Sequence, residues 1–174
     1  MNKKQIRKHH LELRMQLSTS DLDIFSDKIN SKIIDLIEKI NPNSSVGLFY
    51  PYKNEVDVLR ISDDLINKNI KCSLPKVISK GSSLKYFEYN PHSPNLEKGF
   101  GGIMEPKGEK TLDPDIIIAS CSAFNEKGFR VGYGGGFFDR TIEELKKKGN
   151  LKTILAAFEI QKTNYNFQES FDQK

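Results

Sequence analysis

Residues 115–140 read DIIIASCSAFNEKGFRVGYGGGFFDR and carry the clearest structural signal in the chain. The stretch begins with an apolar run over residues 115–119, which is the pattern of a strand buried on both faces of a parallel sheet. After a loop, four glycines occur within residues 132–136, and a helix is predicted over residues 138–147. A buried strand that leads through a glycine-rich turn into a helix indicates an α/β protein.

The same alternation of strands and helices extends over the rest of the chain. Helices are predicted over residues 3–17, over the segment that begins with a cap at 18–20 and ends at residue 40, and over residues 56–68. Strands are predicted over residues 46–50, 70–74, 84–89 and 153–158, and Pro75 is expected to end the second of these strands. In the second helix, the side chains expected to face inward are Leu22, Phe25, Ile29, Ile33, Leu36 and Ile40. Residues 90–114, rich in Pro, Gly and Lys, are predicted to form a long surface connection. The pattern predicts a three-layer α/β/α sandwich with a mainly parallel, Rossmann-like sheet, in one domain over residues 1–174.

The composition excludes several classes of protein. Cys72 and Cys121 lie far apart in the sequence, so no disulfide framework is expected. The chain has three scattered histidines and no closely spaced pair of cysteines, so a structural zinc site is not expected either. No stretch is apolar enough for a signal peptide or a membrane span, and we expect a cytoplasmic monomer without a membrane partner. The net charge of +4 is too mild to indicate nucleic acid, but it suits small anionic ligands.

The glycine cluster indicates an anion site. Because glycine tolerates positive φ and close backbone approach, successive N–H groups can converge on an anion, and the following helix adds its positive N-terminal end. Phosphate binding is one interpretation, and a tight connection between strand and helix is the alternative. Neither a G-x-G-x-x-G dinucleotide pattern nor a G-x-x-x-x-G-K-[ST] pattern occurs.

The charged residues near the glycines and at the N-terminus have two interpretations each. Asp139 can ligate Mg²⁺ together with phosphate oxygens, or it can cap the helix. Arg130 can bind a phosphate or form a surface ion pair. At helical spacing, Lys3, Arg7 and Arg14 form either a solvated basic stripe or part of an anion site.

Several segments, in order along the chain, resemble one protein family. The string GYGGGFFDR (132–140), preceded by AFNEKGFR (123–130), resembles the signature of the 5-formyltetrahydrofolate cyclo-ligase family, also called 5,10-methenyltetrahydrofolate synthetases. The other segments that resemble this family are Lys3-x-x-x-Arg7 with Arg14, Phe49-Tyr50-Pro51 with Glu55, Leu74-Pro75-Lys76-Val77, Gly102-Ile103-Met104-Glu105-Pro106, and Asp172. The resemblance covers essentially the whole chain.

This resemblance implies an enzyme that uses ATP as co-substrate to convert 5-formyltetrahydrofolate, with or without a polyglutamate tail, to 5,10-methenyltetrahydrofolate. It implies catalytic roles for Glu55, Arg130 and Asp139, and Mg²⁺ bound near Asp139 and Asp172. The implied ATP contacts are Lys3, Lys4, Gln5, Ile6, Arg7, Arg130, Val131, Gly132, Tyr133, Gly134, Gly135, Gly136, Phe137 and Phe138. The implied folate contacts are Tyr50, Glu55, Tyr133, Gly134, Gly135, Gly136 and Phe137.

Alternatives stay open for the folate residues and for the function as a whole. Glu55 can be a helix N-terminal charge favoured by the helix dipole, and Tyr50 can be a core aromatic residue. Phe137 and Phe138 occupy positions where the family often has two tyrosines, so ring packing without a hydroxyl group is expected there. The alternative function is a non-catalytic module that binds a phosphorylated metabolite or a folate.

Overall fold

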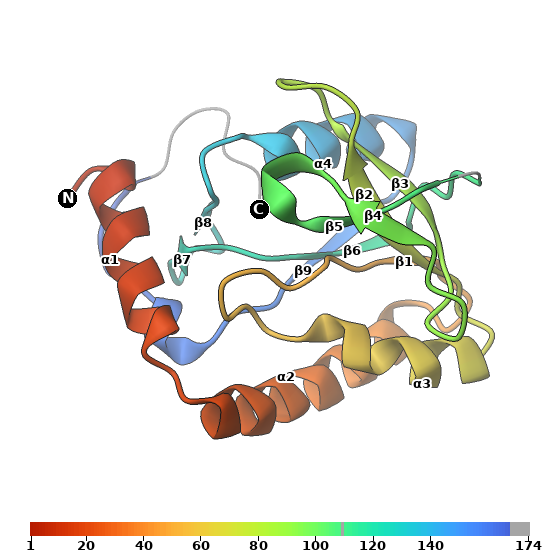
Figure 1. Cartoon of the computed structure of the whole chain (residues 1–174), viewed down its shortest axis with the longest axis horizontal. Helices are drawn as coiled ribbons and strands as arrows, with labels where there is room; N and C mark the ends of the chain where they lie inside the picture. The colour runs from red at the N-terminus through yellow and green to blue at the C-terminus, as the bar shows by residue number, and fades with distance from the viewer. Residues whose placement is uncertain (109, 168–174) are drawn as a thin grey trace.

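A computed structural model describes residues 1–108 and 110–167, and its centre is a five-stranded sheet in the order β3-β2-β1-β6-β9 (Figure 1). The strands are β1 Val46–Gly47, β2 Cys72–Val77, β3 Leu84–Tyr89, β6 Ile116–Ala119 and β9 Lys152–Leu155. Strands β2, β1, β6 and β9 run parallel, and β3 pairs antiparallel with β2 at one edge. The prediction of a mainly parallel α/β sheet is therefore confirmed.

Helices cover both faces of this sheet. Helices α2 (Thr19–Ile40) and α3 (Ser62–Asn67) lie on one face, and α4 (Phe137–Lys148) lies on the other (Figure 1). Strand β6 supplies both faces: Ile116 and Ile118 belong to the core beneath α2 and α3, whereas Ile117 and Ala119 pack with α4. This alternation explains the uninterrupted apolar run, because neither face of the strand meets water.

Helix α1 (Lys3–Met15) lies at the side of the molecule (Figure 1). Its start is a capping box, in which the Asn2 side chain accepts from Gln5 N and the Gln5 side chain accepts from Asn2 N. Ile6 packs in a small separate core against the hairpin of β7 (Ala123–Phe124) and β8 (Arg130–Val131). The helix is thereby attached to the segment that leads into the glycines.

The inward face of α2 differs from the prediction. Its buried residues are Ser26, Asn30, Ile33 and Ile37. Asn30 Nδ2 donates to Asp57 O at 2.8 Å, and Ser26 Oγ accepts from Asp57 N at 3.2 Å. These two bonds turn a partly polar stripe inward. The expectation that Leu36 and Ile40 face the core is wrong, since each is more than a third exposed. Phe25 is also more than a third exposed and reaches only the edge of the core, with its ring centroid 6.3 Å from that of the buried Phe158.

Several predicted element boundaries also need correction. Strand β2 continues through Pro75, because β1 pairs with β2 only at residues 72–73 and the missing N–H therefore breaks no bond to β1. The helix expected over 56–68 begins as the 3₁₀ helix η1 (Val58–Ile61) before α3, and the last strand ends at Leu155. Val46–Gly47 is short, but Leu48 N still donates to Ser73 O.

The predicted surface connection over 90–114 is in fact partly ordered secondary structure. It contains β4 (Leu96–Lys98), the 3₁₀ turn η2 (Phe100–Gly102) and β5 (Met104–Pro106), with β4 and β5 paired antiparallel. Sequence periodicity missed this hairpin because its strands have three residues each. It packs beside β2 and β3, close to the carboxyl end of β2.

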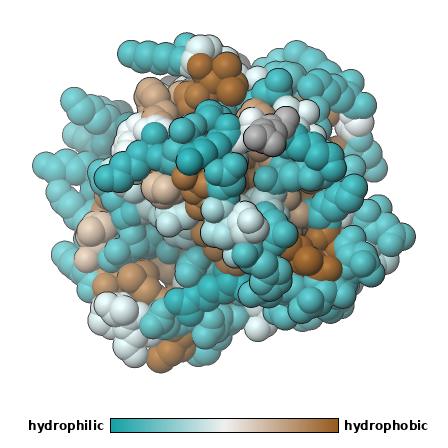
Figure 2. All heavy atoms as spheres, turned by 45° about the vertical axis from the view of Figure 1, so that its right-hand side comes forward, coloured by the Kyte–Doolittle hydropathy of each residue, from teal (hydrophilic) through white to brown (hydrophobic). Residues whose placement is uncertain are grey.

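The outside of the molecule is strongly polar. Figure 2 shows one face on which hydrophilic side chains predominate and hydrophobic ones form separate small patches. Within the described residues, no helix is both long enough and apolar enough to cross a membrane.

Candidate functional site

A cavity of about 540 Å³ opens at the carboxyl ends of the parallel strands. Its walls come from the segments after β1 and β6, the end of β2, the η2–β5 segment, the start of α1 and the glycine loop, residues 132–136. Ligands of open α/β sheets bind at this edge, where loops from neighbouring strands converge. Of the residues implied by the family resemblance, those that line the cavity are Lys3, Arg7, Tyr50, Glu55, Arg130, Val131, Gly132, Tyr133, Gly134, Gly135, Gly136, Phe137, Phe138 and Asp139.

Three of the implied residues that the structure describes are not brought to the cavity. Lys4 and Gln5 are exposed on α1, where Gln5 completes the capping box, and Ile6 is fully buried in the small core beneath this helix. Residues 3 and 7 reach the cavity because they lie four apart on one face of α1. Asp172 lies outside the described residues.

The glycine loop is held against α1 and ends at a helix N-terminus. Arg7 Nε donates to Gly132 O at 2.6 Å. Gly134 has φ +98°, and a Cβ there would lie 3.3 Å from the Arg7 guanidinium. Gly136, at φ +65°, is the N-cap of α4. The loop therefore presents backbone and the positive end of a helix to the cavity, as an anion site requires.

Asp139 and Arg130 form an ion pair beside this loop. Arg130 Nη2 donates to Asp139 Oδ1 at 3.0 Å, and the guanidinium lies over the Phe138 ring, 5.4 Å from its centroid. Because Gly136 is the N-cap and Asp139 lies in the first turn, the alternative that Asp139 caps the helix is wrong. The alternative of a surface ion pair is also wrong for Arg130, whose side chain is only 4% exposed.

One donor of the Arg130 guanidinium has no partner in the described part of the chain. Its Nε is buried and has no hydrogen-bond partner among the described residues. Because an unsatisfied buried N–H group costs free energy, we expect a water molecule or a ligand to supply the missing acceptor for Arg130 Nε.

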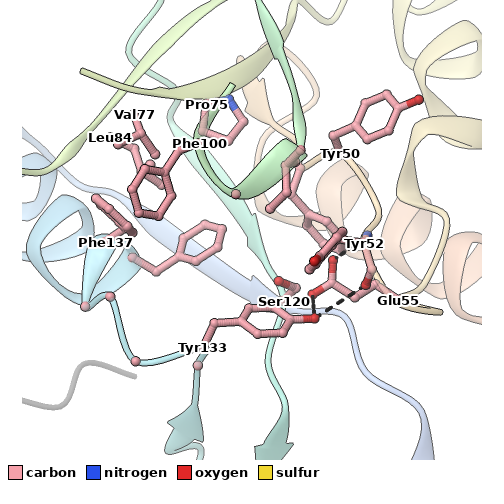
Figure 3. A pocket seen from close by; sticks show the side chains of 18 of the residues that line it. Tyr50, Tyr52, Glu55, Pro75, Val77, Leu84, Phe100, Ser120, Tyr133 and Phe137 are labelled. Atoms are coloured by element: carbon pink, nitrogen blue, oxygen red, sulfur yellow. Dashed lines mark hydrogen bonds between the residues drawn. The ribbon is translucent and has the colours of Figure 1, made fainter. Parts of the chain in front are cut away.

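Glu55 forms the opposite end of the cavity. A tight turn places it there, with Lys53 and Asn54 at φ +50° and +57°. Its Oε2 accepts from Tyr52 N at 2.9 Å, and its Oε1 accepts from the Tyr133 hydroxyl at 3.1 Å (Figure 3). Only 6% of the residue is exposed. The next helix, η1, begins at Val58 with Asp57 as its N-cap, so Glu55 precedes the helix and the alternative of a helix N-terminal charge is wrong.

Burial and the neighbouring donors shift the pKa of the Glu55 carboxyl group in opposite directions. Burial raises the pKa of the Glu55 carboxyl group above its ordinary value. The Arg14 charge opposes this shift most strongly, followed by hydrogen bonds from Ser120, Tyr52 and Tyr133. Burial also raises the pKa of the Tyr133 hydroxyl, which therefore stays protonated and acts as a donor.

Aromatic and aliphatic side chains line the space between these two ends. Figure 3 shows Val77, Leu84, Phe100 and Phe137 gathered on one side of the cavity, with Glu55 on the other. The rings of Phe100 and Phe137 meet edge to face, with centroids 5.4 Å apart. An apolar slot with few polar anchors is the usual form of a site for a ring system.

Sequence reasoning missed several of the lining residues. Those from the predicted surface connection are Phe100, Gly101, Ile103, Met104 and Glu105. Others are Tyr52, Pro75, Val77, Leu84 and Ser120. The segments 74–77 and 102–106 had been singled out by their resemblance to the family, and this signal could have placed them in the site.

The described residues do not form a metal site by themselves. No group of three or more His, Cys, Asp or Glu side chains is arranged to hold an ion in this part of the chain. Asp139 is the carboxylate beside the glycine loop, and one of its oxygens already accepts from Arg130. Mg²⁺, however, commonly takes one or two carboxylates together with substrate phosphates and water, and Asp139 fits that role.

Comparisons with known proteins agree on one family. Residues 1–166 match the family model described as the 5-formyltetrahydrofolate cyclo-ligase family. The chain is 27% identical over 161 residues to 5-formyltetrahydrofolate cyclo-ligase from Haemophilus influenzae, covering 88% of this chain and 84% of the relative. It is 27% identical over 150 residues to the protein of the same name from Mycoplasma pneumoniae, covering 85% and 81%. The solved structure of 5,10-methenyltetrahydrofolate synthetase from Aquifex aeolicus is similar with a TM-score of 0.80 at 28% identity, covering 98% of this chain and 85% of that one.

Proposed function

The chain belongs to the 5-formyltetrahydrofolate cyclo-ligase family, and we propose that its cavity is where ATP drives the cyclisation of 5-formyltetrahydrofolate to 5,10-methenyltetrahydrofolate. One observation carries the proposal. A single cavity has a glycine loop with Arg7 and Arg130 at one end and the buried carboxylate of Glu55 at the other. A phosphate donor and a folate can therefore meet in it.

The glycine-loop end suits the phosphates of ATP. The loop amides and the N-terminus of α4 supply fixed partial positive charge, and the cations that line this end are Lys3, Arg7 and Arg130. The role of these groups is to stabilise charge on the transferring phosphoryl group, since phosphoryl transfer depends mainly on positioning and electrostatics.

The other end suits the folate ring system. The Glu55 carboxylate accepts from Tyr52 N, the Tyr133 hydroxyl and the Ser120 side chain, and its two oxygens together offer about four acceptor directions. Glu55 can therefore accept from an N–H group of the folate ring while its protein bonds stay in place. Tyr50 lines the cavity near Glu55, and Phe100 and Phe137 provide an apolar wall for the ring.

The chemistry requires activation of the formyl oxygen. A formamide carbon is a poor electrophile and its oxygen a poor leaving group. The formyl oxygen attacks the γ-phosphorus of ATP and ADP leaves; N10 of the same folate then attacks the activated carbon, the C–O bond to phosphate breaks, and the N10 proton is lost. Ring closure is intramolecular, so holding the folate in the reactive conformation supplies much of the rate enhancement.

No covalent nucleophile from the protein is needed in this scheme. Arg130, held by Asp139 and placed over Phe138, keeps a rigid position beside the phosphates. Asp139 is the residue that would hold Mg²⁺ together with phosphate oxygens. When bound, Mg²⁺ neutralises negative charge on the nucleotide phosphates.

The test is the appearance of the methenyl chromophore in purified protein given 5-formyltetrahydrofolate, Mg²⁺ and ATP. Product should form with all three present and should fail to form without ATP or after EDTA treatment. Tight binding of both ligands with no chromophore would instead identify a non-catalytic binding module. Cyclisation at an undiminished rate without nucleotide would overturn the proposed activation of the formyl oxygen.

A further inference from the structure

Arg14 joins three segments of the site without lining the cavity. Its side chain is fully buried in the last turn of α1. Arg14 Nε donates to Lys53 O at 2.9 Å, Nη1 donates to Cys121 O at 2.8 Å, and Nη2 donates to the Tyr133 hydroxyl at 2.5 Å. The turn after β1, the segment after β6 and the glycine loop thus share one guanidinium group.

The bond from Arg14 sets the direction of the Tyr133 hydroxyl proton. A tyrosine hydroxyl has one proton to donate, and here its oxygen accepts from Arg14. The proton is then available to Glu55 Oε1, 3.1 Å away, which is a stronger acceptor than the neutral Tyr52 carbonyl oxygen at 3.4 Å. The result is an ordered chain of donors from Arg14 through Tyr133 to Glu55.

Arg14 also supplies the positive charge nearest to Glu55. Its Nη1 lies 4.0 Å from Glu55 Oε1, and both side chains are almost completely buried. The other groups that face this carboxylate from the elements packed around it are Tyr52, Ser120, Cys121 and Tyr133. All of these are neutral, so Arg14 is the cation that balances the buried charge of Glu55. A buried carboxylate is stable in its ionised form only when it is paired and hydrogen-bonded.

We propose that Arg14 is a positioning residue for folate recognition, which holds the Glu55 carboxylate ionised and directs the Tyr133 hydroxyl onto it. This rests on the proposed function, because that function assigns Glu55 to the folate. Protonation of Glu55 would turn one acceptor oxygen into a donor and remove a bond to a folate N–H. Arg14 therefore sets the lower end of the pH range in which folate is used.

The experiment compares Arg14→Met, Arg14→Lys and a matched control, Arg60→Met. Arg60 pairs with Asp23, Asp27 and Asp57 on the surface, away from the cavity. The measurement is kcat/KM for 5-formyltetrahydrofolate against pH at saturating ATP. An opposite charge at this distance typically lowers a carboxyl pKa by about one to three units, so the acid limb should move up by about that amount in Arg14→Met. Arg14→Lys keeps the positive charge, so the acid limb of its pH profile should stay near that of wild type while its KM for folate rises. Arg60→Met should change neither the acid limb nor the KM for folate.

Two further variants keep the proposal testable if Arg14→Met folds poorly. Tyr133→Phe leaves the charge of Arg14 in place and should raise the folate KM about fivefold to tenfold. Because Arg14 acts through Glu55, Arg14→Met in a Glu55→Gln background should lower folate use little further and remove the pH effect.

The proposal is overturned if Arg14→Met lowers activity equally at every pH, or if Arg14→Lys shifts the acid limb as far as Arg14→Met does. It is also overturned if Tyr133→Phe has a wild-type folate KM, or if Arg14→Met costs as much with Gln at position 55 as with Glu. Failure of the proposed function would look different, because wild-type protein would then form no methenyl product under any condition.

Discussion

Replacing Glu55 by Gln tests the assignment of the folate end of the cavity. The substitution keeps the size of the side chain but removes its charge and one of its acceptor oxygens. In the structure both oxygens accept hydrogen bonds, one from Tyr52 N at 2.9 Å and one from the Tyr133 hydroxyl at 3.1 Å. A glutamine amide can satisfy only one of these donors, and its NH₂ group must face the other. It also leaves the buried Arg14 guanidinium without the carboxylate 4.0 Å away.

The expected loss follows from the hydrogen bond to folate. A hydrogen bond to a charged partner contributes about 1.5–3 kcal/mol. At about 1.4 kcal/mol for each factor of ten, Glu55→Gln should lower kcat/KM for 5-formyltetrahydrofolate by about 10-fold to 100-fold. The affinity for ATP, measured without folate, should hardly change, because the glycine loop is held to α1 by Arg7.

The assay is methenyl absorbance for folate use and calorimetric titration for ATP. Glu159→Gln serves as the matched control, since the Glu159 side chain is 84% exposed. A value of kcat/KM for folate within twofold of wild type would refute the assignment. Loss of ATP binding in the variant, with folate binding intact, would refute it as well.

Three further predictions concern the glycine loop, the metal and the pH dependence of stability. Gly134→Ala places a Cβ at a residue with φ +98° and against Arg7, at a strain cost of about 1–3 kcal/mol, so the KM for ATP should rise at least about fivefold. The control is Gly149→Ala, which should be neutral because an added Cβ meets nothing within 4 Å there. Equal kinetics in the two variants would contradict the role of the loop in ATP binding. Asp139→Asn keeps an oxygen for Arg130 but loses its charge, so the Mg²⁺ concentration for half-maximal turnover should rise; an unchanged Mg²⁺ titration would exclude Asp139 as a ligand. Because the folded-state pKa of Glu55 is raised above its ordinary value of 4.5, this carboxyl group stabilises the fold at low pH and the contribution is lost as the pH rises through the folded-state pKa. The Tm of wild type relative to Glu55→Gln should therefore fall as the pH rises above about 4.5, and a constant or rising difference would disprove the sign of the shift.

Local patterns were sufficient for the fold class and for one end of the site. The apolar run at β6 indicates that this strand is buried on both faces, because a strand with no face toward water has apolar residues throughout. The glycines before α4 mark backbone that must adopt positive φ or approach a ligand closely, and Gly134 and Gly136 do have positive φ. Both signals depend on neighbours in the sequence and can be read without the tertiary structure.

Contacts between distant segments could not be read in this way. Arg14 has the spacing of a solvated basic stripe, yet it is buried because it lies between residues 53, 121 and 133. The inward face of α2 follows Ser26 and Asn30, because the backbone of Asp57 offers them hydrogen bonds.

The sequence by itself therefore determined the α/β architecture, the glycine loop and the resemblance to a folate-cyclising family. Only the tertiary structure decided that Glu55 is a buried carboxylate, that Asp139 pairs with Arg130 instead of capping α4, and that residues 100, 101 and 103–105 line the cavity. The physical reason is that hydrophobic periodicity and backbone conformation are local properties. The burial and pairing of a charge depend instead on which distant segments fold against it.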